Sequence, residues 1–231
     1  MKIGALQKFS GIDFPGRLSV VVFTQGCNLR CGYCHNPELV LPKMFSEPLD
    51  ENSFFEFLKA RKGAIEGVVI TGGEPTIHAD LPDFIERIKR EKFLVKLDTN
   101  GTNPKMLFEL VNRGLVDYIA MDIKGSFDKY ELITHVDVKI EDIIKSIDII
   151  MKSGISYEFR TTMLKNYHTL EDFFKIGKYV EGAEKYVLQN FKPTKSIDKS
   201  LLKNGKPFEQ SEIEEVKKIL ENFVSLVEIR M

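Results

Sequence analysis

The feature of this sequence that most restricts its fold is a regular alternation of short β-branched runs with amphipathic stretches. Six runs have the composition of strands, and they cover residues 18–24, 67–71, 93–98, 116–122, 156–162 and 185–190. The clearest helix is predicted at residues 139–153, where Ile143, Ile147 and Ile150 share one face and Gly154 follows the last turn. Strands that alternate with helices predict right-handed βαβ units and a parallel sheet, because parallel neighbours need a crossover connection.

The number of these units limits how far the sheet can close. Six units occupy residues 18 to about 200, which is too few for an eight-unit barrel of roughly 250 residues. We therefore predict an α/β fold, a parallel partial (β/α)6 TIM-like barrel with helices outside. The length of 231 residues predicts a single domain over residues 1–231, with a carboxy-terminal helix and strand at 208–231 whose position the pattern does not define.

Local signals predict where three further helices start. Asn103-Pro104 places proline in a first helical turn, and Thr169-x-x-Asp172 and Ser211-x-x-Glu214 have the spacing of capping boxes. In a capping box the two side chains bond reciprocally to backbone N–H groups at the helix start. We therefore expect a helix to begin at each of these three places.

The balance of charges argues against two large classes of partner. The chain has 33 Lys and Arg against 34 Asp and Glu, a formal net charge of -1, and no long run of one sign. We therefore expect no nucleic acid and no membrane surface as partner. The first residues lack the apolar core of a signal peptide and no stretch reaches roughly 18 apolar residues, so we expect a cytoplasmic protein.

Polar residues and glycines follow each predicted strand. In parallel α/β folds the active site lies at the carboxyl ends of the strands. We therefore expect the strand-end segments to surround one mouth, and these segments are residues 25–37, 71–75, 98–101, 121–124, 159–162 and 189–193.

The first of these segments contains all three cysteines of the chain, Cys27, Cys31 and Cys34. None remains elsewhere to form the disulfide framework of a small secreted protein. Three thiolates spaced C-x3-C-x2-C on one loop can converge on one face of an iron–sulfur cubane. Such a cubane has three ligated irons, and its fourth iron keeps an open position at which a small molecule offering an amine and a carboxylate can bind.

Two other metal groups are compatible with parts of this loop. Cys31-x-x-Cys34-His35 matches the C-x-x-C-H pattern of c-type haem attachment, which belongs to electron-transfer proteins. That reading leaves Cys27 without a role. A zinc site made of the three cysteines and His35 is the second alternative, typical of a binding module, but the adjacent Cys34 and His35 converge poorly on one ion.

The loop, with an aromatic residue before its last cysteine, resembles the radical S-adenosylmethionine signature, and residues 33–37 (Tyr-Cys-His-Asn-Pro) resemble the glycyl-radical-enzyme activase branch. The similarity continues through residues 72–74, 98–101 and 122–124. Pyruvate formate-lyase activating enzymes carry Asp-Gly-Pro-Gly near the start, where this chain has Asp-Phe-Pro-Gly at 13–16. The chain is more similar there to anaerobic ribonucleoside-triphosphate reductase activating proteins.

The resemblance implies two cofactors, one [4Fe-4S] cluster on Cys27, Cys31 and Cys34, and S-adenosylmethionine. It implies reductive cleavage of S-adenosylmethionine to a 5′-deoxyadenosyl radical, which takes a hydrogen atom from a glycine of a partner enzyme. The expected partners are a glycyl radical enzyme, with anaerobic ribonucleoside-triphosphate reductase favoured, and a flavodoxin- or ferredoxin-like reductant. The alternatives are a pyruvate formate-lyase-type activase and a radical enzyme that acts on a small molecule, like the deazaguanine synthases.

The resemblance also implies which residues contact S-adenosylmethionine. Backbone at the two glycines approaches the methionine moiety, the glutamate accepts from its ammonium group, and Tyr33 packs against adenine. The full set comprises Tyr33, Cys34, His35, Gly72, Gly73, Glu74, Asp122, Ile123, Lys124, Arg160 and Lys192.

Two further sets of polar residues complete the expectations. Asp98 and Thr99, with Asp122, match a monovalent-cation site of related activases, and otherwise the first of them caps a turn. The remaining histidines have no neighbouring ligands and are expected on loops or surfaces, and these are His78, His135 and His168.

Overall fold

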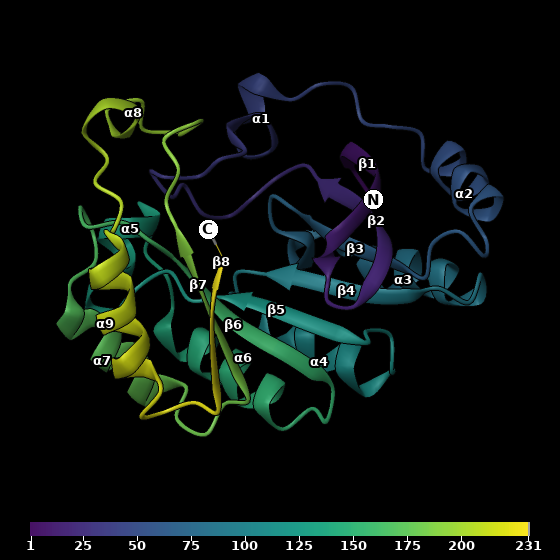
Figure 1. Cartoon of the computed structure of the whole chain (residues 1–231). Coiled ribbons are helices and arrows are strands. Elements are labelled where there is room, and N and C mark those ends of the chain that lie inside the picture. Colours follow the sequence, from purple (N-terminus) through teal and green to yellow (C-terminus); the bar gives the residue numbers. More distant parts are fainter. Residues whose placement is uncertain (231) are drawn as a thin grey trace.

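The six predicted strands are neighbours in one twisted sheet of a computed structural model that describes residues 1–230 (Figure 1). Each predicted strand is present with ends shifted by at most two residues, and β2 through β7 pair in parallel in chain order. Their bounds are β2 Arg17–Thr24, β3 Gly67–Gly72, β4 Leu94–Thr99, β5 Tyr118–Asp122, β6 Ser156–Met163 and β7 Lys185–Asn190.

Two more strands extend this sheet to eight, in the order β1 to β8. Strand β1 (Ile3–Phe14) pairs antiparallel with β2 and was not predicted, because its exposed residues and two glycines break the alternation of apolar and polar positions. The carboxy-terminal run forms β8 (Leu226–Arg230), which pairs in parallel with β7. Within the described residues β1 and β8 are the two edges, so the predicted partial barrel is confirmed.

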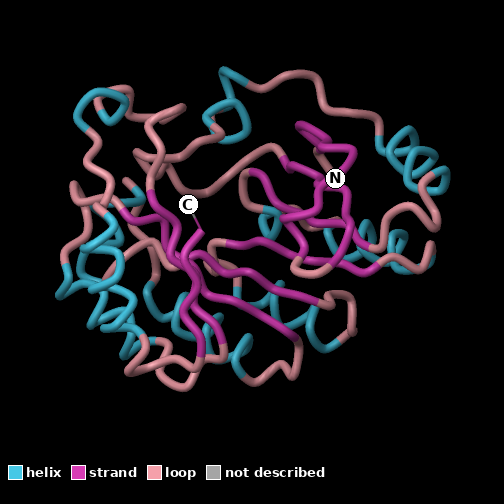
Figure 2. The backbone as a smooth tube through the Cα atoms, viewed as in Figure 1, coloured by secondary structure: helices cyan, strands magenta, loops and turns pink. Residues whose placement is uncertain are grey.

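Helices cover the outer face of the curved sheet (Figure 2). Their bounds are α1 Pro37–Val40, α2 Glu51–Ala60, α3 Leu81–Arg90, α4 Pro104–Asn112, α5 Tyr130–Thr134, α6 Ile140–Met151, α7 Leu170–Tyr179, α8 Leu201–Asn204 and α9 Gln210–Leu220, with short 3₁₀ turns at Pro42–Met44, Pro75–Ile77 and Phe127–Lys129. Since α6 lies within the predicted residues 139–153, that helix is confirmed.

Capping chemistry fixes three of the helix starts. The Asn103 side chain accepts a hydrogen bond from Met106 N at 3.2 Å, and Thr169 with Asp172 forms the predicted capping box of α7. The box predicted at Ser211 and Glu214 is wrong. Helix α9 has its N-cap two residues earlier, and its box is made by Glu209 and Glu212, whose carboxylates also accept backbone N–H bonds.

The strands divide their side chains between two environments. On β5, Ile119 and Met121 pack into the large apolar core under the helices, whereas Asp122 points to the concave face of the sheet. On β4, Lys96 and Asp98 occupy that same concave face. The outer face is therefore a conventional core, and the inside of the partial barrel is charged.

None of the helices within residues 1–230 has the length and apolar content needed to cross a lipid bilayer.

Candidate active site

The carboxyl ends of the parallel strands surround one cleft with a cavity volume of about 190 Å³. All but two of the predicted site residues line it. They are Cys27, Cys31, Tyr33, Cys34, His35, Gly72, Gly73, Glu74, Asp122, Lys124 and Arg160, together with the predicted cation-site residues Asp98 and Thr99.

The two residues outside the cleft have clear physical reasons to be there. Ile123 is fully buried in the core beneath the helices, because side chains alternate across the sheet and its neighbours Asp122 and Lys124 face inward. The side chain of Lys192 is exposed beyond the end of β7. Its contribution is a backbone carbonyl that lies 2.9 Å from His35 Nε2.

The three cysteines form one wall of the cleft. Cys31 is buried, and Cys27 and Cys34 are partly buried. Burial raises the pKa of the Cys27 thiol to about 12 and that of the Cys31 thiol to about 11, far above neutral pH. The metal-free wall therefore consists of protonated thiols, and a positively charged metal group is needed to stabilise three thiolates there.

The arrangement of the possible ligands distinguishes a single zinc ion from an iron–sulfur cluster. Among residues 1–230, no three Cys, His, Asp or Glu side chains converge on a position for a single metal ion. The His35 ring stacks on Phe191 with ring centroids 5.5 Å apart, in addition to its contact with the Lys192 carbonyl. An iron–sulfur cluster does not require its ligands to converge on one ion, because each cysteine ligates its own iron. The donor set and the cleft fit a cluster better than a zinc ion.

The glycines opposite the cysteines pack directly against the cysteine loop. Gly72 has a φ of +113°, and a Cβ atom at this position would lie 2.4 Å from Thr24 N. A Cβ atom on Gly73 would lie 1.9 Å from the Gly26 carbonyl oxygen, which accepts a hydrogen bond from Glu74 N at 2.8 Å. The structure therefore gives both glycines a packing role at the start of the cysteine loop, independent of any ligand.

We expect Gly73→Ala to lower the free energy of unfolding by about 1–3 kcal/mol, the usual cost of overpacking, because backbone atoms are the obstacle. The displaced Gly26 should also expose the Cys27 thiol to alkylating reagents. The matched control is Gly11→Ala, since the nearest atom to a Cβ there is a flexible leucine methyl at 3.9 Å. Chemical denaturation and thiol alkylation of both variants measure the difference, and equal results for the two would contradict this packing role.

Glu74 joins the ends of two strands. Its buried carboxylate accepts hydrogen bonds from Thr76 N at 3.0 Å, Thr99 Oγ1 at 2.8 Å and Asn100 N at 2.6 Å. Burial raises the pKa of this carboxyl above its usual range even though these donors oppose the shift. Glu74 thus holds the end of β3 against the end of β4, and an ammonium group of a ligand would have to share an oxygen that already accepts from backbone.

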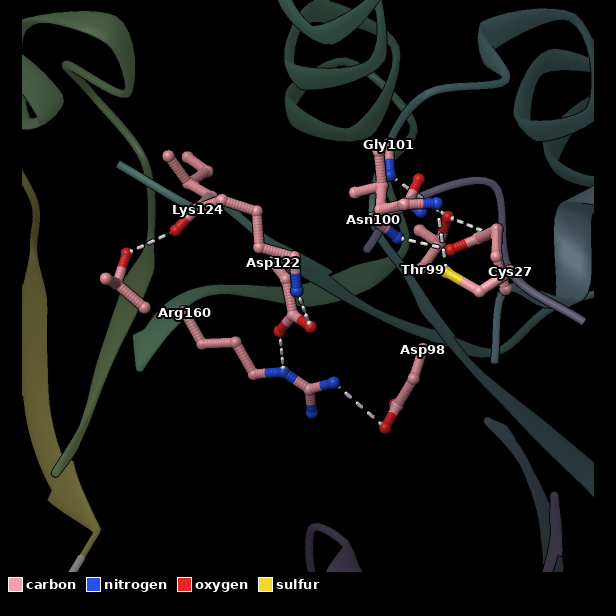
Figure 3. Close-up of polar contacts among 12 residues, drawn as sticks. Cys27, Asp98, Thr99, Asn100, Gly101, Asp122, Lys124 and Arg160 are labelled. Carbon is pink, nitrogen blue, oxygen red and sulfur yellow. Dashed lines mark hydrogen bonds and ion pairs between the residues drawn. The ribbon is translucent and has the colours of Figure 1, made fainter. Parts of the chain in front are cut away.

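Alternating charges form the floor of the cleft (Figure 3). The Arg160 guanidinium lies between two carboxylates, with its Nη2 3.1 Å from Asp98 Oδ2 and its Nε bonded to Asp122. Lys124 Nζ lies 2.9 Å from Asp122 Oδ2, and Lys96 pairs with Asp98. Although burial opposes ionisation, Arg160 and Lys124 hold the pKa of the Asp122 carboxyl well below its usual range.

Lys124 is fixed through its backbone from both sides. Its N–H donates to Tyr130 Oη at 3.2 Å, and its carbonyl lies 2.9 Å from His168 Nε2. His168 follows β6 on a loop, as predicted, but it is buried and not on the surface. Burial lowers the pKa of its imidazole, so the neutral ring is favoured.

Sequence reasoning missed several residues of this region. Lys96, buried beneath Asp98, was detectable from the period of two along β4, which puts both side chains on one face. Asn100 and Thr162 also line the cleft. No sequence signal identifies the Tyr33 hydroxyl as an unusual group, yet it is a buried polar atom without a hydrogen-bond partner among the described residues.

Comparison with known proteins gives one consistent result. A profile of the Radical SAM superfamily matches residues 21–179. A Methanocaldococcus jannaschii protein provisionally named as a glycyl-radical enzyme activating enzyme is 35% identical over 99% of this chain and 95% of its own length. The 7-carboxy-7-deazaguanine synthase of Aquifex aeolicus is 31% identical over 81% of this chain and 78% of its own. The pyruvate formate-lyase-activating enzyme of Clostridium pasteurianum is 28% identical, over 81% and 80% respectively.

A solved structure shares the architecture. SuiB from Streptococcus suis matches with a TM-score of 0.70 at 14% identity, over 91% of this chain and 48% of SuiB. This chain therefore spans about half the length of SuiB, and the likeness concerns the fold. Because the superfamily profile matches most of the chain and the Methanocaldococcus relative aligns over nearly all of it, this chain belongs to the radical SAM superfamily, whose members use a [4Fe-4S] cluster and S-adenosylmethionine, and it is related to the glycyl-radical enzyme activating enzymes.

Proposed function

We propose that this protein activates a glycyl radical enzyme, and that its partner is an anaerobic ribonucleoside-triphosphate reductase. When bound in the cleft, the reduced cluster and S-adenosylmethionine supply a 5′-deoxyadenosyl radical that removes a hydrogen atom from a glycine of the partner. The observation that carries the proposal is the wall of three thiols in a cleft with a charged floor, in a chain related over almost its whole length to an activase.

The chain's own residues have distinct roles in this proposal. Cys27, Cys31 and Cys34 hold the cluster. Lys124 and Arg160 line the cleft beside the carboxylates of Asp98 and Asp122. These two cations suit the carboxylate of S-adenosylmethionine and partly offset the charge of three thiolates.

The remaining contacts orient the ligand. Backbone groups of Gly72 and Gly73 line the cleft opposite the thiols, where no side chain separates them from a bound methionine moiety. Tyr33 offers its unpartnered hydroxyl, and His35 lines the same wall. Thr99 lies beside Asp98 and Asp122 at the predicted monovalent-cation site, which remains part of this proposal.

The partner assignment depends on residues that lie away from the cleft. The Asp13-to-Gly16 segment forms the turn between β1 and β2, at the end of the sheet opposite the carboxyl ends of the parallel strands. Phe14 is buried there with its ring 6.1 Å from the ring of Tyr118. The residues of this turn serve packing within the chain. Because the turn lies away from the cleft, we expect the partner to contact other surfaces.

The test is anaerobic reconstitution of the protein with iron and sulfide, followed by dithionite and S-adenosylmethionine. We expect 5′-deoxyadenosine to form, and a glycyl doublet to appear by electron paramagnetic resonance only when anaerobic ribonucleoside-triphosphate reductase is added. A reductase whose radical glycine is replaced by alanine is the control and should give no doublet. Formation of 5′-deoxyadenosine without a doublet on this reductase would overturn the partner assignment, and failure to form it would overturn the activity.

A second candidate is favoured by one comparison. The 31% identity to a deazaguanine synthase extends over 81% of this chain, so a small-molecule substrate is the competing reading. The same reconstituted protein, supplied with the substrate of that synthase, distinguishes the two by chromatography. Formation of the deazaguanine product in place of a glycyl radical would support this second candidate.

A further inference from the structure

We propose that the surface formed by residues 192–206, here called the lysine strap, is the docking site for an acidic electron-transfer protein that reduces the cluster. This inference rests on the proposed function, because that reaction requires one electron per cleaved S-adenosylmethionine. The strap follows β7 and ends before α9, and it includes the short helix α8 (Figure 1).

The strap is strongly basic in a chain that is nearly neutral. It contains five lysines and one aspartate, so 5 − 1 gives a formal charge of +4, against -1 for the whole chain. All five lysines are exposed, and they are Lys192, Lys195, Lys199, Lys203 and Lys206. Only Lys195 has an ion-pair partner within the described part of the chain, Glu38 at 2.9 Å. Four cationic side chains therefore remain available to an acidic partner.

The strap is bound directly to the cysteine loop. The Gly32 carbonyl, between Cys31 and Cys34, accepts hydrogen bonds from Asp198 N at 2.9 Å and from Ser196 Oγ at 2.5 Å. The Lys192 carbonyl lies 2.9 Å from His35 Nε2. The strap therefore packs directly on the cysteine loop, which gives a short path for an electron from a protein seated on the strap.

The far end of the strap is equally well anchored. Lys206 N donates to Asn166 Oδ1 at 2.8 Å, and the Lys206 carbonyl accepts from Lys165 N at 2.8 Å. Leu201 is buried beside the cysteine loop residues Leu29 and Cys31, whereas the neighbouring Leu202 is 39% exposed. The strap therefore presents an ordered basic surface with one exposed apolar side chain among its lysines, a composition suited to a transient protein contact.

The position of the strap favours a reductant over the glycyl radical enzyme. None of residues 192–206 lines the cleft, so contacts with the strap do not themselves occupy it. The partner whose glycine reacts must instead reach into the cleft itself. The glycyl radical enzyme would therefore use the cleft, and the strap suits the reductant, which delivers only an electron.

The electron count is simple for a flavodoxin used as the probe. The anionic flavin hydroquinone loses one electron and becomes the neutral semiquinone, and the oxidised cluster gains that electron without a proton. Stopped-flow absorbance of the semiquinone measures the rate with the reconstituted protein. We expect Lys199→Glu/Lys203→Glu to slow this step about 10- to 100-fold at low ionic strength, and we expect the difference to vanish in high salt.

The matched control is Lys152→Glu/Lys218→Glu. These exposed lysines lie near the ends of α6 and α9, which lead into β6 and β8 at the opposite end of the sheet from the cysteine loop. The control changes the net charge equally and should slow reduction less than threefold. Lys199→Gln/Lys203→Gln removes charge without reversing it and should fall between the wild type and the strap variant.

Binding and a small reductant complete the test. Calorimetric titration of the cluster-free protein with oxidised flavodoxin should show weaker binding only for the strap variants, while dithionite should support 5′-deoxyadenosine formation equally in all proteins. Equal flavodoxin rates for all variants, or equal slowing by strap and control variants, would overturn the docking site, as would loss of the dithionite reaction in the strap variant alone. Absence of 5′-deoxyadenosine with dithionite in the wild type would instead overturn the proposed function and leave the docking result readable.

Discussion

Replacing Cys31 with alanine is expected to abolish both the [4Fe-4S] cluster and the reductive cleavage of S-adenosylmethionine. Cys31 is 7% exposed and lies among Leu29, Tyr33 and Leu164, and the chain has no cysteine beyond its two partners to replace it. A two-thiol remnant leaves a second iron open to solvent and oxygen, so the cluster should not persist. Iron content, the brown absorbance and 5′-deoxyadenosine under dithionite measure the loss.

The control for this variant is Val69→Ala, a truncation on β3 in a separate apolar cluster with Phe14, Val21 and Tyr118. It removes buried volume without touching the cysteine loop, so it should lower stability but retain the cluster. Retained 5′-deoxyadenosine formation in Cys31→Ala would reject the ligand assignment. Because burial raises the pKa of the Cys27 and Cys31 thiols to about 12 and 11, cluster loading releases protons, and loading should become more complete as the pH rises from 6 to 8.

The sheet was predictable because its strands are buried on one or both faces. Runs such as Val68 to Ile70 have the β-branched composition of a buried parallel strand, and the βα spacing fixes their order. Strand β1 was not predicted because it lies at an edge, where Phe9 and Ile12 are exposed and the alternation of apolar and polar residues is lost, although its backbone pairs with β2. The helix start at Glu209 escaped because a glutamate is an uncommon N-cap.

The cleft could be predicted for those residues whose position is determined by the end of a strand. The carboxyl ends of parallel strands must meet, so cysteines, glycines and charges after six strands had to share one mouth. Two features depended on tertiary packing and could not be derived. The burial of His168 beneath Lys124 follows from the path of a loop, and the position of Lys192 outside the cleft follows from the direction of the chain after β7.

The interior of the partial barrel contains two groups of paired charges, and they differ in their distance from the cleft. Near the cleft, Arg160 bridges two carboxylates, while deeper in the barrel Arg230 of β8 binds both oxygens of the buried Glu158 at 2.7 Å. The second pair holds the last strand to the sheet and does not line the cleft. The two arginines therefore allow a structural loss to be separated from a loss of ligand binding.

Arg160→Met is expected to weaken binding of S-adenosylmethionine about 100-fold and to lower the free energy of unfolding by about 3–5 kcal/mol, the usual cost of removing one partner of a buried ion pair. Arg230→Met should also lower stability, because it removes the bidentate partner of Glu158 and leaves Tyr118 and Lys185 as its direct contacts among the described residues, but it should keep ligand affinity within about threefold. Calorimetric titration of the reconstituted proteins compares the two, and equal loss of affinity would assign Arg160 a purely structural role.

The pH dependence of Arg160→Met gives an independent check. In the wild type, Arg160 helps hold the pKa values of Asp98 and Asp122 below their usual range, so this stabilisation is present above about pH 4 and is lost as the pH falls through the lowered folded-state values. Without the guanidinium each carboxylate keeps its lysine, Lys96 for Asp98 and Lys124 for Asp122, so their folded-state pKa values rise toward the unfolded values. The variant should therefore gain less stability than the wild type as the pH rises through about 4, and the gap between the two proteins should widen from about pH 3 to about pH 6. Chemical denaturation at these two pH values measures the gap, and a gap that is equal or smaller at the higher pH would show that Arg160 does not control the charge of these carboxylates.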